Sequence, residues 1–485
     1  MAKLTFDDLY QVSLSSLGSA ADDWKEMVGQ LKDLLDDAAG MARKSDAARW
    51  AGVNADVTKP FVRKTAGEFQ DAHTEATSIW SVLRDAHTDL AAIQTNLKKL
   101  VDVEAKSKGM RVQGREDGTV ACVFVADRSD GDGPSQQELD AQRNLENRIN
   151  GLIAQAEEID GSVVRALRKS HGGDVHDFGH AKYDSLDDAQ AERAVELAKK
   201  SIDRSQHDSE LSTTELAEFR QLLAGNAKSP EFAADFYRAL GPKDALTFEA
   251  QIAIDASTRG DKERLRLARS IQENMGVALG AATQPHKDNR DTAFREDKDY
   301  LGRAWVDDLK RVGRQQLALN IGMDHAQPTG HQVLSSLLHY GDYGKNFLVP
   351  IGEDMVAFER KGGSWPIPDP YNGSDDVSLN LDGKGEPGWD PMTGFMEALG
   401  RDPEASTAFF GGSTGGGESG LRKLSNLDFS SVTRRGRTLA NGSRTRRAAA
   451  SCRTRRAESR VRRPWGTRWS RRRRDGRTTA TCLPR

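Results

Sequence analysis

The stretch that decides the fold is FQDAHTEATSIWSVLRDAHTDLAAIQTNLKKL, residues 69–100. Its apolar residues recur in alternating steps of three and four, which is the seam of an amphipathic helix sustained for more than four heptads. The seam consists of Phe69, Ala72, Ala76, Ile79, Leu83, Ala86, Leu90, Ile93, Leu97 and Leu100. A helix with one apolar stripe is not stable alone, so this segment requires a partner that covers the seam.

The nearest candidate partner is a second stripe upstream. It runs through Leu17, Ala21, Trp24, Val28, Leu31, Leu35 and Ala38. We expect the two helices to fold back on each other as an antiparallel hairpin, with Leu83, Leu90 and Leu97 as packing positions. Pro60 suits the first turn of the second helix, where a missing N–H costs nothing. In the connecting loop, Trp50 is expected to cover the open end of the seam, and Gly52 permits the backbone to turn.

The tripeptide Trp50-Ala51-Gly52, its position in the loop, the flanking seams and the length of about a hundred residues together resemble the WXG-type helical-hairpin proteins exported by type VII secretion. The resemblance covers residues 1–105. It implies a hairpin fold and, as partner, a second helical-hairpin protein or another copy of this chain. The export pattern of that family is Tyr-x-x-x-Asp/Glu, which Tyr183 with Asp187 and Tyr371 with Asp375 match. Neither pair directly follows the hairpin, so we interpret both as ordinary surface positions.

The rest of the sequence predicts a mainly α protein with one small β-hairpin. Asp117-Gly118 between two β-rich runs, 110–113 and 119–125, predicts that β-hairpin within residues 106–126. Residues 127–136 read as a linker, and 137–425 as one or two helical domains. Within the latter, Ser212 to Glu215 is a capping box, and Ser229-Pro230 opens a helix that Gly241 ends.

The blocks 329–361 and 389–410 resemble a region of actinobacterial proteins with the same kind of amino-terminal hairpin. That resemblance extends the architecture and implies no particular activity.

Composition limits the class of protein. The chain has 485 residues, 37% of them apolar, which is long enough for two to four domains. Three cysteines exclude a disulfide-dense scaffold, and Cys122 is expected to pack as a small apolar residue. The longest apolar run, Val120–Ala126, is too short to span a bilayer, and no signal-peptide pattern begins the chain. We expect synthesis in the cytoplasm and, if the chain is exported, export without a classical signal.

One histidine cluster has the residue types of a metal site. His171, His176 and His180 lie within ten residues, and three imidazoles can bind zinc, as in a metal-dependent hydrolase. Gly172, Gly173 and Gly179 favour a solvated polar loop instead. A second set, His325, His331 and His339, lies beside a leucine-rich stripe, where we expect half-buried histidines with satisfied hydrogen bonds.

A Gly-x-Ser-x-Gly string surrounds Ser413. A nucleophile elbow requires a strand before the serine and a helix after it. Residues 408–410 could end a strand, but GGESG follows where the helix should begin, so residues 411–420 read as a flexible linker. No cofactor is predicted.

The last 55 residues differ in composition from the rest. Residues 431–485 hold 19 arginines, no lysine and two acids, whereas residues 1–430 hold 51 basic and 71 acidic residues. One interpretation is a nucleic-acid-binding tail, with Arg471, Arg472, Arg473 and Arg474 as candidate phosphate contacts. The other, which we favour, is the out-of-frame translation of a GC-rich gene. Both predict a disordered tail over 426–485.

The sequence therefore predicts a non-enzymatic interaction protein, resembling a type VII secretion substrate or the amino-terminal part of a secreted effector. A nucleic-acid-associated protein that binds through its arginine-rich tail is the first alternative. A metal-dependent hydrolase at His171 to His180 is the second.

Overall fold

The computed structural model describes most of the chain up to Gly411. The described ranges are residues 4–125, 133–171, 182–203, 210–285, 296–319, 327–367, 377–383 and 387–411. The tail therefore lies outside the described residues.

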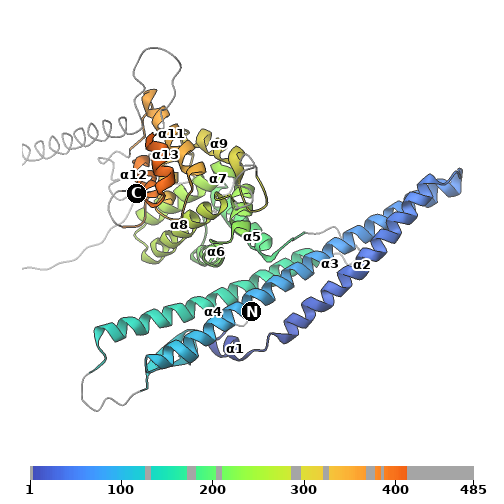
Figure 1. The fold of residues 1–485 in the computed structure, drawn as a ribbon, viewed down its shortest axis with the longest axis horizontal. Helices are drawn as coiled ribbons and strands as arrows, with labels where there is room; N and C mark the ends of the chain where they lie inside the picture. The colour runs from blue at the N-terminus through green and yellow to red at the C-terminus, as the bar shows by residue number, and fades with distance from the viewer. Residues whose placement is uncertain are drawn as a thin grey trace, which may run out of the picture. The chain divides into compact units, whose positions relative to one another are not determined.

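The predicted fold class is confirmed, because the described residues are mainly helical and contain one two-stranded antiparallel sheet (Figure 1). The amino-terminal elements are α1 (Phe6–Gln11), α2 (Ser15–Ala47), α3 (Val53–Lys99), the π-helical turn η1 (Leu100–Ala105), β1 (Met110–Gly114), β2 (Val120–Phe124) and α4 (Gln136–His171). The later helices are α5 (Leu186–Ile202), α6 (Thr213–Asn226), α7 (Pro230–Thr258), α8 (Lys262–Ala282), α9 (Gly302–Gly313), α10 (Gly330–Leu338), α11 (Lys345–Arg360), α12 (Pro391–Arg401) and α13 (Pro403–Gly411).

Helices α2 and α3 form the expected antiparallel hairpin (Figure 1). The predicted stripe of α2 faces α3, with Ala21 and Ala38 buried and the residues between them half-buried. One detail of the prediction is wrong. Pro60 lies in the interior of α3 and not in its first turn, because the helix already begins at Val53, directly after the turn at Gly52.

The carboxyl-terminal half of the α3 seam is covered mainly by α4 and not by α2. Leu97 lies in one buried cluster with Leu145 and Ile149 of α4, together with Leu9 of α1 and Val120 of β2. The first helix of the region predicted over 137–425 thus packs on the hairpin. The reason is that the stripe of α4 supplies the apolar cover that the second half of the α3 seam requires.

The β-hairpin forms where it was predicted. Val112 pairs with Cys122 across the two strands, and α4 fixes the second strand through side chains that accept its backbone N–H groups. Asn150 accepts from Val120 at 2.9 Å, and Glu146 accepts from Cys122 at 2.8 Å. Cys122 is buried, as expected, and burial raises the pKa of its thiol to about 11.

Helices α5–α13 enclose a second core. Its centre is aromatic, with Phe219 of α6 packed edge-on to Phe248 of α7 at 4.7 Å between ring centroids. The predicted capping box of Ser212 and Glu215 is present at the start of α6. Gly241 has φ +72° and divides α7 into two helical segments, so the first segment ends where the sequence predicted.

Candidate interaction surface

The bend between α2 and α3 carries the two residues that the sequence singled out. Gly52 caps the start of α3 with φ +103°, a conformation that favours glycine. Trp50 lies two residues earlier, in the bend. It is 39% exposed, and the expectation that its indole covers the end of the seam stays a prediction. A hydrogen bond joins the bend to α3: Nζ of Lys59 donates to the Ala48 carbonyl at 3.0 Å.

The three predicted packing leucines are held inside the chain. Leu97 is fully buried, and Leu83 is buried beside Ala21 and Ile79. Leu90 is half-buried against the same core as Leu97. Because these side chains contact other helices of their own chain, they stabilise the hairpin and offer no free surface to a partner.

The exposed apolar residues of the hairpin extend from the middle of α2, across the bend, to the first turns of α3. Helix α2 exposes Met27, Leu34 and Met41, which recur every seven residues, and α3 exposes Val53, Val57 and Phe61. We call these six residues and Trp50 the distal surface. Apart from Trp50, this surface was not predicted from the sequence, because its residues lie off the inward stripe. The seven-residue spacing on α2 was the available signal.

The ends of the distal surface differ in charge. Residues 22–37 contain six acids and two lysines, whereas residues 43–64 contain six basic residues and two acids. Three ion pairs involve these charges: Lys32 with Asp36, Arg63 with Asp46 at 3.6 Å, and Lys64 with Glu68 at 3.5 Å. The apolar side chains of the distal surface therefore lie among acidic residues on α2 and among basic residues around the bend.

The candidate metal and nucleic-acid residues are mostly not described. His171 ends α4 with Nδ1 3.6 Å from Oε1 of Glu75, while His176, His180 and the arginines at 471–474 lie outside the described residues. Among the residues that the structure describes, no group of three His, Cys, Asp or Glu side chains is arranged to hold a metal ion.

The histidines of the second set have different environments. His331 is fully buried and not half-buried as expected; its Nε2 lies 3.0 Å from Oδ2 of Asp354, and its Nδ1 has no partner. His339 has Nδ1 2.6 Å from Oε2 of Glu397. His325 lies outside the described residues. His331 is fully shielded from solvent and Asp354 nearly so, which is the environment of a core hydrogen bond.

Two other sequence hypotheses are corrected. Residues 408–410 do not end a strand, because they belong to α13; Ser413 itself lies outside the described residues. Tyr183 is not a surface position, since it is buried and its hydroxyl donates to Oε2 of Glu192. Asp187, its partner in the export pattern, is half-buried in α5, whereas Tyr371 and Asp375 are not described.

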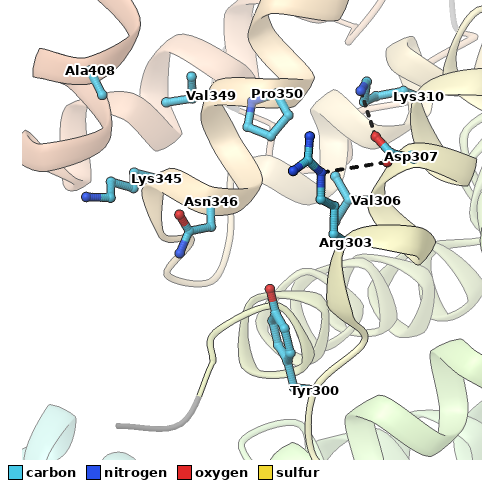
Figure 2. Close-up of a pocket in the computed structure, with 10 residues that line it drawn as sticks. All are labelled: Tyr300, Arg303, Val306, Asp307, Lys310, Lys345, Asn346, Val349, Pro350 and Ala408. Carbon is cyan, nitrogen blue, oxygen red and sulfur yellow. Dashed lines mark hydrogen bonds and ion pairs between the residues drawn. The ribbon is translucent and has the colours of Figure 1, made fainter. Parts of the chain in front are cut away.

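A hollow in the second core region was not predicted from the sequence. It lies between α9 and α11 and is shown in Figure 2 with the side chains that line it. Its residues come from three helices and one loop. No local sequence pattern predicts such a long-range arrangement.

Comparison of the chain with protein-family models, with curated proteins and with solved structures found no match. In the part of the chain that the structure describes, no helix combines the length and the apolar character that crossing a membrane requires.

Proposed function

We propose that this chain is a non-enzymatic helical interaction protein whose distal surface binds a second helical hairpin. The observation that carries the proposal is the exposure of seven large apolar side chains between the middle of α2 and the first turns of α3. Exposed apolar side chains that gather in one region, bordered by charge, are typical of interaction surfaces.

The form of the surface favours a helical partner. At the other end of the hairpin, Val163 and Leu167 of α4 pack against the α2–α3 pair as a third helix. Among the described residues, no third helix covers Val28, Leu31 and Leu35, and these inward residues stay half-buried. A hairpin supplied by another molecule would complete the bundle there, as α4 does at the opposite end.

The resemblance to WXG-type hairpins supports the same proposal. Trp50 and Gly52 lie in the bend of a hairpin of the expected length, so the chain would act as a type VII secretion substrate or as the amino-terminal part of a secreted effector. Burial of Tyr183 argues that Tyr183 with Asp187 is not a freely readable export pattern in the folded chain.

The test replaces the distal surface in the full chain. Leu34, Met41, Val57 and Phe61 are changed together to Ser, and binding is measured both to the chain itself by sedimentation and to short hairpin proteins encoded beside its gene. A matched control changes four residues of similar exposure elsewhere to Ser: Val103, Val123, Val125 and Ile367. We expect the distal variant to weaken association at least about tenfold and the control to leave it unchanged. Equal association of both variants would overturn the proposal, as would the absence of any hairpin partner or self-association.

A further inference from the structure

The hollow between α9 and α11 encloses about 270 Å³ and is half-open to solvent (Figure 2). Its lining combines an apolar wall with several hydrogen-bond donors, which is the composition of a small-molecule site.

Tyr300 is the most informative residue of the lining. Only 3% of it is exposed, yet its hydroxyl points into the hollow (Figure 2) and has no hydrogen-bond partner in the described part of the chain. The body of Tyr300 is therefore buried, whereas its hydroxyl is accessible from the hollow and free to donate to a bound molecule. Burial, reinforced by Asp297, raises the pKa of Tyr300 above its ordinary value. The hydroxyl therefore remains a donor at neutral pH.

The cations around the hollow are paired to different degrees. Lys310 contacts Asp307 at 2.8 Å, and Lys345 is paired with Glu404. Arg303 has only a distant ion pair, 3.9 Å from Asp307, and its side chain is 77% exposed. Its guanidinium thus retains donors above the hollow (Figure 2), in the fork that suits a carboxylate.

The wall opposite these donors is apolar. It is formed by Val349 and Pro350 of α11 and Ala408 of α13, and Val306 of α9 adds apolar surface beside Arg303 (Figure 2). These side chains offer surface for the body of a compact ligand but no group that would hold a second charge. The Asn346 side chain adds one neutral amide at the edge of the hollow.

We propose that this hollow binds a small organic monocarboxylate with a compact apolar body. The carboxylate would accept hydrogen bonds from the guanidinium of Arg303 and the hydroxyl of Tyr300, and its apolar body would contact Val306, Val349 and Pro350. This site is independent of the distal surface, because no residue is shared between them.

The test uses 4-phenylbutyrate as the probe and 4-phenylbutanamide as its neutral control, with the full chain in a calorimeter. A ligand of this size gives a Kd of about 0.1–1 mM at ordinary ligand efficiency. We expect the amide to bind at least about tenfold more weakly, since it lacks the charge that Arg303 recognises.

Two variants of α9 make the test specific. Arg303→Gln is expected to weaken binding of 4-phenylbutyrate at least about tenfold, whereas Arg311→Gln, which removes an exposed arginine paired with Asp308 on the same helix, should leave it unchanged. Tyr300→Phe removes only the hydroxyl and is expected to weaken binding about fivefold. Absence of binding, equal affinity for acid and amide, or equal effects of the two arginine variants would overturn the proposal.

Discussion

The Asp354 carboxylate accepts a hydrogen bond from Nε2 of His331 at 3.0 Å and one from Nε of Arg314 at 2.9 Å. His331 and Asp354 belong to α10 and α11, so this contact joins two helices inside the core. Burial by itself would raise the pKa of Asp354, but the hydrogen bonds from His331 and Arg314 outweigh it and lower the pKa to about 2. Burial also lowers the pKa of His331, so the pair is a neutral imidazole donating to a carboxylate.

Removing this carboxylate is predicted to be strongly destabilising. Asp354→Ala leaves a buried imidazole N–H and a guanidinium without their acceptor, which costs about 3 kcal/mol of unfolding free energy. The midpoint of urea unfolding, followed by tryptophan fluorescence, measures the loss. Asp308→Ala removes an exposed partner of Arg311 and should cost no more than about 0.5 kcal/mol. Similar midpoints for the two variants would show that the buried hydrogen bonds of Asp354 contribute nothing to the free energy of unfolding.

A second prediction concerns carboxylates that face one another where α3 meets α5. Desolvation first, and then the charges of Asp187 and Asp85, raise the pKa of Asp89 to about 6. Between pH 3.8 and 6 the folded chain keeps this proton while the unfolded chain loses it. The contribution of Asp89 to the free energy of unfolding therefore falls as pH rises through that window, and it remains low at higher pH.

Asp89→Asn abolishes that titration. The variant is expected to be more stable than the parent by about 1 kcal/mol at pH 7.5, after allowance for solvent screening, and equally stable near pH 3.5. Thermal unfolding at the two pH values measures this difference. Asp36→Asn, in the exposed pair with Lys32, is the control and should shift stability by no more than about 0.5 kcal/mol. A pH-independent effect of Asp89→Asn would contradict the assignment.

Two glycines of the hairpin give opposite predictions. An added Cβ meets no atom within 4 Å at either Gly52 or Gly67, so only backbone conformation decides the outcome. Gly52→Ala places alanine at φ +103° and should destabilise the hairpin by about 1–2 kcal/mol. Gly67→Ala lies within α3 and should stabilise it by up to about 1 kcal/mol. Hydrogen exchange of the distal part of α3 measures both. Changes of the same sign would refute the conformational explanation.

Local patterns in the sequence were sufficient for the α2–α3 hairpin and insufficient for the helix that packs on it. The period of α3 and the turn at Gly52 predicted the hairpin because both signals lie within a few residues. The buried cluster that holds Leu97 and Leu145 joins segments separated by a β-hairpin and a linker, so no short stretch of sequence contains it. The hollow around Tyr300 was not predicted for the same reason, since the residues that line it come from α9, α11, α13 and the loop before α9.

The division of the hairpin into a covered and an uncovered half gives the last prediction. Leu97 is fully buried beneath α4, whereas Leu34 is 49% exposed on the distal surface. Leu97→Ala therefore loses buried apolar contact and leaves a cavity, which should cost about 2–5 kcal/mol. Leu34→Ala removes a side chain that is half in water already and should cost less than about 1 kcal/mol in the isolated chain. Urea unfolding compares the two variants.

The same Leu34→Ala change should weaken binding of a hairpin partner, a loss that Leu97→Ala would not produce while the chain stays folded. If Leu34→Ala proved as destabilising as Leu97→Ala in the isolated chain, the distal half would already be covered from within, and no surface would remain for a second hairpin.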